Sequence, residues 1–270
     1  MKKITLVILL LAVTASCFSQ TKKQAKKAKR KAEAERIRKL VEREAEGTII
    51  FNRQNAFGFK LNTDGYGLFY EHGRAKSIKR THLYWIELGE KRHPKEEKLT
   101  SISIFSGANP FIFGKINNLY FVKLGFAQQH LLGGKGPKNG VAISAIYGGG
   151  FSAGLLKPYF LKVMDPSNAS GYRDVRYRND DTAYFAGSRY TETIGSSGFT
   201  KGFGFIKFVP GFHGRLAVRF DYGRFNEVLS ALEVGVTADY YTQEMPILVH
   251  TSNNKFFFNA YLALVVGKRR

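Results

Sequence analysis

The chain has 270 residues, with 28 glycines, 7 prolines and an aromatic content of 14%. Its formal net charge of +21 would usually indicate a nucleic-acid partner, but an N-terminal export signal argues against that class. After Val13 no apolar run is long enough to cross a bilayer as a helix, so the pattern excludes a helical membrane protein. Many glycines and aromatic residues with few prolines favour strands joined by tight turns.

Residues 1–19 are predicted to be a signal peptide. Two lysines open the segment, an apolar run follows from Ile4 to Val13, and small residues continue to Ser19. The run is too short to span a bilayer. An alternative stays open, in which Cys17, the only cysteine, is a lipidated first residue.

Residues 20–46 are predicted to form a basic, partly helical arm in the periplasm. The segment is rich in alanine and has neither glycine nor proline before Gly47, which favours helix. Seven cations precede its first acidic residue: Lys22, Lys23, Lys26, Lys27, Lys29, Arg30 and Lys31. Such an arm is either a solvated spacer or a contact with anionic phospholipid headgroups or peptidoglycan.

In residues 47–270, eight segments alternate between an apolar parity and a parity of charges and glycines. A strand sends alternate side chains to opposite faces. The segments are 57–62, 68–71, 83–88, 120–127, 141–148, 215–222, 232–240 and 256–267. The pattern predicts an all-β fold, an eight-stranded antiparallel up-and-down transmembrane β-barrel of the Gram-negative outer membrane. A lipocalin-like soluble barrel, with the apolar parity inside, is the alternative.

The links between these segments alternate in length. Those at 73–80, 130–140 and 223–227 are short, whereas those at 90–118, 157–211 and 242–255 are long. Short periplasmic turns and long outer loops are typical of outer-membrane barrels. The asymmetry therefore predicts that the N-terminus, the short links and the basic C-terminal residues lie on the periplasmic side.

Nine charged residues fall on the inward parity and are predicted to form a charge network in the lumen. They are Lys60, Glu71, Glu87, Lys123, Arg215, Arg219, Asp221, Glu233 and Asp239. Burying such charges is costly unless they pair, and an eight-stranded barrel is just wide enough for side chains to fill it. We therefore expect a salt-bridged, largely closed lumen, with a narrow or gated channel for small solutes as the alternative.

No motif for catalysis, cofactors or metals is found. The glycines of 148–154 lack the ending of a phosphate loop, and the histidines lack metal-binding spacing. Ser144 and His213 could serve a lipid hydrolase only if the fold brought them together with an acid. We expect no catalytic, cofactor-binding or metal-binding residues, no cofactor and no enzyme, with a lipid-acting enzyme as a minor alternative.

The long link 157–210 is the best candidate for a binding surface. It is far longer than an ordinary loop, and such loops are usually functional or disordered. Its composition is aromatic, and one stretch interleaves aromatic residues with arginines, types enriched at binding hot spots. The candidates are Tyr172, Arg173, Arg176, Tyr177 and Arg178. The alternative is that the aromatic residues fold the loop over the barrel mouth as a lid.

Three stretches carry a family resemblance: 148–159 (GGGFSAGLLKPY), 207–214 (KFVPGFHG) and 256–269, with FFFNAYL followed by GKR. They resemble a family of uncharacterised outer-membrane β-barrel proteins of Bacteroidota. The resemblance covers most of residues 50–270 and implies an outer-membrane barrel without an established activity. A structural, anchoring or surface-interaction role is therefore expected, with outer-membrane lipids and an envelope protein complex as partners.

Overall fold

The computed structural model describes residues 33, 35, 51–100, 109–134, 140–178, 181–187, 190–223, 227–249, 251 and 253–270. The chain divides into two units, 1–49 and 50–270. The predicted signal peptide and the seven cations of the arm lie outside the described residues. In the first unit only Glu33 and Glu35 are described, both exposed and in a helix. All the other described residues belong to the second unit.

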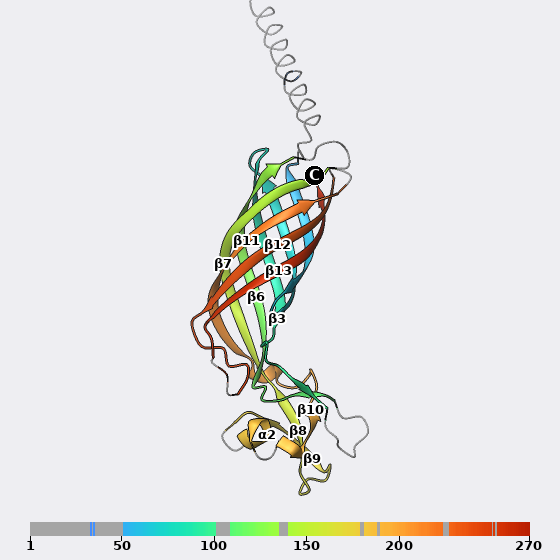
Figure 1. Cartoon of the computed structure of the whole chain (residues 1–270), viewed down its shortest axis with the longest axis vertical. Coiled ribbons are helices and arrows are strands. Elements are labelled where there is room, and N and C mark those ends of the chain that lie inside the picture. The colour runs from blue at the N-terminus through green and yellow to red at the C-terminus, as the bar shows by residue number, and fades with distance from the viewer. Residues whose placement is uncertain are drawn as a thin grey trace, which may run out of the picture. The chain divides into compact units, whose positions relative to one another are not determined.

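Eight strands close into an antiparallel barrel (Figure 1), in the order β1-β13-β12-β11-β7-β6-β3-β2. The strands are β1 (Arg53–Asn62), β2 (Gly65–Ala75), β3 (Arg80–Lys91), β6 (Asn117–Gly133), β7 (Ala142–Pro158), β11 (Lys207–Asp221), β12 (Val228–Tyr241) and β13 (Phe256–Arg269). Each pairs with its neighbours along the chain, and β1 pairs with β13 from Gln54↔Arg269 to Asn62↔Tyr261 to close the sheet. The predicted eight-stranded antiparallel up-and-down barrel is therefore confirmed.

The predicted faces hold along the barrel strands, because burial alternates residue by residue. Several strands are longer than the apolar pattern indicated. β7 continues to Pro158 and β11 begins at Lys207, where the two remain paired (Lys207↔Leu156). The glycines at 148–150 interrupt the apolar alternation, so the sequence pattern did not indicate this extension. A side chain does not fit there, because a Cβ on Gly150 would lie 2.0 Å from the carbonyl oxygen of Leu124. The run is thus a site of close strand approach.

The link between β7 and β11 is folded, although the sequence suggested one long loop. It holds β8 (Phe160–Met164), β9 (Tyr172–Arg176), α2 (Thr182–Ala186), η1 (Tyr190–Glu192), β10 (Thr193–Ser196) and η2 (Phe203–Phe205). β8 is the central strand of a three-stranded sheet, order β10-β8-β9. We call the described part of 159–206 the loop subdomain. The short strands β4 (Lys98–Leu99) and β5 (Phe111–Ile112) pair with each other.

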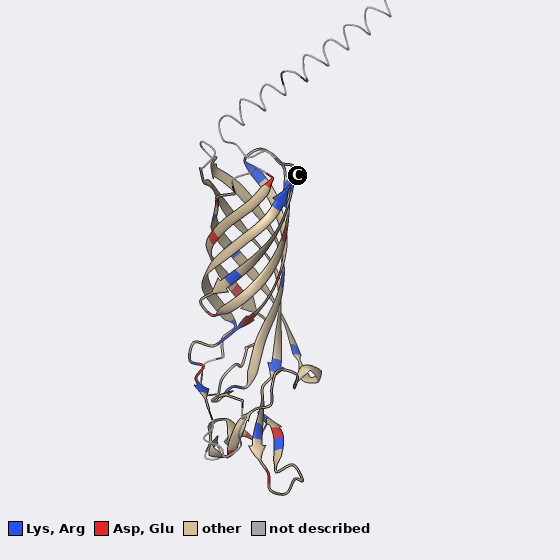
Figure 2. Cartoon of the chain, turned by 90° about the vertical axis from the view of Figure 1, so that its right-hand side faces the viewer, with Lys and Arg blue, Asp and Glu red and all other residues tan. Residues whose placement is uncertain are grey.

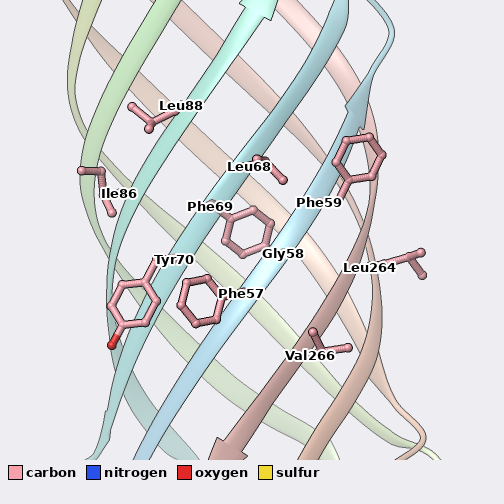
Figure 3. Close-up of a pocket in the computed structure, with 10 residues that line it drawn as sticks. All are labelled: Phe57, Gly58, Phe59, Leu68, Phe69, Tyr70, Ile86, Leu88, Leu264 and Val266. Atoms are coloured by element: carbon pink, nitrogen blue, oxygen red, sulfur yellow. The ribbon is translucent and has the colours of Figure 1, made fainter.

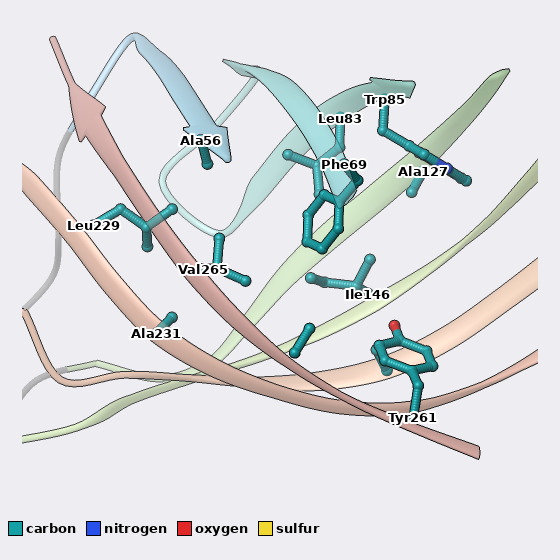
Figure 4. Close-up of a cluster of buried hydrophobic side chains, with 12 residues drawn as sticks. Ala56, Phe69, Leu83, Trp85, Ala127, Ile146, Leu229, Ala231, Tyr261 and Val265 are labelled. Carbon is teal, nitrogen blue, oxygen red and sulfur yellow. The ribbon is translucent and has the colours of Figure 1, made fainter. Parts of the chain in front are cut away.

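Three apolar clusters stabilise the described unit. One fills the barrel interior, where Phe69, Trp85, Ile146 and Tyr261 point toward one another (Figure 4). A second joins Met245, Ile247 and Leu248 to residues of β6, β7, β11 and β12 at the end of the barrel that carries the long links. The third is the core of the loop subdomain with Phe111. We call the two barrel ends the loop end and, where Arg53 and Arg269 lie, the terminal end.

No helix among the described residues is long and apolar enough to cross a membrane.

Candidate functional site

The structure places all nine predicted lumen charges inside the barrel. Each is at most 3% exposed: Lys60, Glu71, Glu87, Lys123, Arg215, Arg219, Asp221, Glu233 and Asp239. In Figure 2, cations and anions lie close together along the barrel wall. A buried charge is tolerated only when it is paired and hydrogen-bonded. The pairing therefore decides what this interior can do.

The middle cluster joins two arginines to two glutamates. Arg219 donates from Nη1 to Glu71 Oε1 at 2.8 Å and from Nη2 to Glu233 Oε2 at 2.6 Å. Arg215 Nη2 lies 3.0 Å from Glu71 Oε2 and 3.5 Å from Glu233 Oε1. Tyr261 donates its hydroxyl hydrogen bond to Glu233. Two cations thus meet two carboxylates, and the cluster is neutral.

The loop-end cluster also holds two cations and two carboxylates, of which the sequence pattern indicated only Lys123 and Asp239. Lys91 Nζ lies 2.8 Å from Asp64 and 2.9 Å from Asp239, and Lys123 Nζ lies 2.7 Å from Asp239. Lys91 keeps the inward parity of Glu87, so extending that alternation by four residues would have found it. Asp64 sits in a turn, where parity gives no signal.

Two single pairs complete the interior. Lys60 Nζ lies 2.7 Å from Glu87 Oε2. At the terminal end Arg269 Nη2 lies 2.6 Å from Asp221 Oδ2, and Arg269 Nε donates to Gln54. Arg269 belongs to the basic C-terminal residues expected at the periplasmic side, and its odd parity on β13 turns it into the barrel.

The described interior thus holds equal numbers of cations and carboxylates. The six cations are Lys60, Lys91, Lys123, Arg215, Arg219 and Arg269, and their partners are Asp64, Glu71, Glu87, Asp221, Glu233 and Asp239. Each cluster is neutral by itself, and apolar side chains pack between clusters and over the loop end. Paired charges and apolar side chains therefore occupy the described interior and connect residues of different strands.

Ser144 and His213 are not joined. His213 instead lies with Nδ1 3.0 Å from the hydroxyl of Ser152, and Ser144 accepts a hydrogen bond from Gln129. The His213 ring packs edge-on against Trp85, with ring centroids 5.5 Å apart. Among the described residues, no group of three or more histidine, cysteine or acidic side chains could hold a metal ion.

The five loop candidates gather on and just after β9, but most of them make contacts within the loop subdomain. Arg173 pairs with Asp181 at 3.0 Å. The guanidinium of Arg176 lies 4.1 Å from the centre of the Phe205 ring. Tyr172 packs against Lys162 and Tyr177 against Phe185, and Arg178 is exposed. These residues hold the subdomain together while Tyr172, Arg173 and Tyr177 keep more than a third of their surface exposed.

Asp174 ties two parts of the loop subdomain. Its carboxylate accepts a hydrogen bond from Ser197 Oγ at 2.7 Å and lies 3.0 Å from Lys201 Nζ. Burial alone would raise the pKa of this carboxyl, but the contacts with Ser197 and Lys201 outweigh burial and hold the pKa below its ordinary 3.8.

The outer face of the barrel is the reverse of its interior. Outward positions carry large exposed apolar side chains, among them Phe57, Leu68, Leu124, Phe151 and Val266. Charged residues of the outward parity occur, within the described strands, only among the first or last two residues of a barrel strand. These residues are Arg53, Arg74, Arg80, Glu90, Lys157 and Lys268. Between these charged ends the outward face is mainly apolar, with polar residues such as Asn55, His72, Gln128 and His130 toward the terminal end.

No family model and no curated protein match the chain, so the resemblance to the Bacteroidota family stays a prediction. Among solved structures the chain is similar to Neisserial surface protein A, at 7% identity, with a TM-score of 0.42 over 82% of this chain and 97% of that one. It is also similar to Ail, the attachment invasion locus protein of Yersinia pestis, at 4% identity, with a TM-score of 0.35 over 82% of this chain and 100% of that one. Likenesses this distant say nothing of what the chain binds.

Proposed function

We propose that the chain is an outer-membrane β-barrel with a closed lumen, and that its role is structural, anchoring or surface interaction through the loop subdomain. The observation that carries the proposal is the reversed polarity of the barrel, with an apolar band outside and paired charges inside. A soluble lipocalin-like barrel has its apolar residues inside, whereas a barrel in lipid turns them outward.

The height of the apolar band supports this location. On β13 the outward residues from Phe256 to Val266 are all apolar and cover ten residue steps. At about 3.3 Å per residue and a tilt of about 40°, this run has a height of roughly 25 Å. An outer-membrane barrel needs an apolar band of about that height.

The orientation is inferred from the rims and links. The terminal end, which carries four outward cations and the short links, faces the periplasm in this proposal. The loop subdomain then faces the cell exterior. The basic arm precedes β1, so the proposal leaves it in the periplasm, where anionic phospholipid and peptidoglycan are the available polyanions.

Single-channel recording tests the closed lumen. The full chain, folded into a planar bilayer, is expected to show no discrete conductance steps, because neutral clusters and apolar packing fill the interior. Stable steps that depend on ion size would support the alternative of a narrow channel.

Folding itself is measured by heat-modifiable migration on gels. A chain that stays in the aqueous phase without detergent or lipid would contradict the membrane location.

A further inference from the structure

A groove of about 510 Å³ lies on the outer face of the barrel, over β13, β1, β2 and β3 (Figure 3). Two successive cross-strand rows line it. The first row is Val266, Phe57, Tyr70 and Ile86, and the second is Leu264, Phe59, Leu68 and Leu88. Gly58 and Phe69 lie between the rows. The groove is therefore almost entirely hydrocarbon and aromatic.

Toward the terminal end the next row is polar. It consists of Lys268, Asn55, His72 and Tyr84, paired across the same four strands. Asn55 Oδ1 lies 2.7 Å from His72 Nδ1 and accepts a hydrogen bond from the Tyr70 hydroxyl at 3.3 Å. Tyr70 thus joins the apolar groove to the polar row.

The row after that is cationic. Arg53 and Arg74 stand directly opposite each other on β1 and β2, and His82 follows on β3. Like charges directly opposite each other destabilise a strand pair. Within the described part of the chain, no side-chain carboxylate lies at ion-pair distance from either guanidinium, and the main-chain oxygen of Arg270 accepts hydrogen bonds from the backbone amides of Asn52 and Arg53, each at 2.8 Å. An anion bound between the two guanidinium groups would remove this repulsion.

The order of the rows matches the order of groups in a phospholipid. Arg53 and Phe57 are four residues apart, or roughly 13 Å at about 3.3 Å per residue. A phospholipid has its phosphate, its glycerol and esters, and its acyl chains in the same sequence as the cationic, polar and apolar rows. Arginine is well suited to the phosphate because its planar guanidinium donates two parallel hydrogen bonds.

We propose that these rows form a binding site for one anionic phospholipid of the inner leaflet, with an acyl chain in the groove and the phosphate between Arg53 and Arg74. The inference rests on the proposed function, because it needs the barrel to stand in a bilayer with its terminal end toward the periplasm.

Native mass spectrometry of the full chain in detergent micelles tests the site, with phosphatidylglycerol as the probe. The double variant Arg53→Gln/Arg74→Gln is expected to lower the affinity for phosphatidylglycerol on the order of tenfold. Leu68→Trp, which fills the groove, is expected to lower the retention of bound lipid. The matched controls are Lys207→Gln/Lys255→Gln, two exposed cations at the loop end, and Val234→Trp on β12, and both are expected to retain lipid as the wild type does.

Heat-modifiable migration of each variant in vesicles separates the two proposals. If the wild-type chain does not fold into vesicles, the proposed function fails and this site fails with it. If it folds, and the arginine variant retains as much phosphatidylglycerol as its control, the lipid site alone is overturned. Equal losses in the arginine variant and in the Lys207→Gln/Lys255→Gln control would also overturn it, because they would show a general effect of charge.

Discussion

Removing the Arg219 guanidinium should be among the most damaging single changes in the barrel. Arg219 makes four hydrogen bonds, two to Glu71 and two to Glu233, and all three side chains are at most 1% exposed. Arg219→Met leaves Arg215 alone with two buried carboxylates. Breaking a buried ion pair from one side costs about 3–5 kcal/mol, so we expect a loss of that size in the free energy of unfolding.

A double variant tests the same cluster by restoring its balance of charge. Arg219→Met/Glu71→Gln leaves one cation, Arg215, and one carboxylate, Glu233, which lie 3.5 Å apart. Residues in one ion-pair network couple by about 0.5–3 kcal/mol. We therefore expect the double variant to be more stable than the sum of its single variants predicts, and close to or above Arg219→Met alone.

Urea unfolding in lipid vesicles measures these differences. Trp85 is the only tryptophan, and it lies inside the barrel with the Arg215 guanidinium 4.8 Å from its ring centre, so its fluorescence reports on the cluster. Lys207→Met, an exposed cation at the loop end, is the control and should change stability by no more than about 0.5 kcal/mol. A loss below about 1 kcal/mol in Arg219→Met, or strict additivity in the double variant, would refute the paired interior.

Three further predictions concern the outward face of the barrel, its orientation and the loop subdomain. Val234→Arg places a charge on the outward face of β12 and should destabilise the barrel by about 2–4 kcal/mol, seen as less heat-modifiable protein than in Val234→Leu; equal yields would contradict the lipid-facing assignment. On intact cells an impermeant thiol reagent should label Thr200→Cys in the loop subdomain but not Ser77→Cys at the terminal end, and the reverse pattern would invert the topology. Because the pKa of Asp174 is lowered in the folded protein, its stabilising contribution is present above pH 3.8 and is lost as the pH falls through the folded pKa. Acid should therefore increase protease cleavage of the loop subdomain less in Asp174→Asn, which lacks this contribution at every pH, than in the wild type. An equal increase in both proteins would exclude Asp174 as the cause.

The faces of the strands could be predicted from the sequence because they depend only on local alternation. Phe57 and Lys60 differ in parity, and nothing distant is needed to send one outward and the other inward. The ion pairs could not be predicted. Arg219 and Glu71 are 148 residues apart, and they meet only because β1 pairs with β13 and closes the barrel. Pairing across the lumen depends on registers that alternation does not specify.

The loop subdomain is the part least accessible to sequence reasoning. Its strands are four or five residues long, too short for alternation to stand out. Its core depends on contacts such as those of Phe111 with residues of the 159–206 segment. The aromatic and arginine residues near Tyr172 have the composition of a binding surface, yet Arg173 and Arg176 make contacts that also fold the subdomain. Aromatic residues and arginines serve both in binding surfaces and in the packing of a subdomain, so composition alone does not distinguish the two roles. The contacts in the folded structure do.

The balance of charge inside the barrel changes what the net charge of +21 means. Six cations and six carboxylates of the described interior cancel, so the described lumen contributes nothing to this excess. Part of it forms the outward rim at the terminal end, where Arg53, Arg74, Arg80 and Lys268 are exposed. An excess of cations at a rim next to an apolar band attracts anionic headgroups, and this attraction weakens as salt rises. In the proposed membrane location, the exposed cations of this rim would act on the membrane surface, whereas the paired charges of the interior stabilise the barrel.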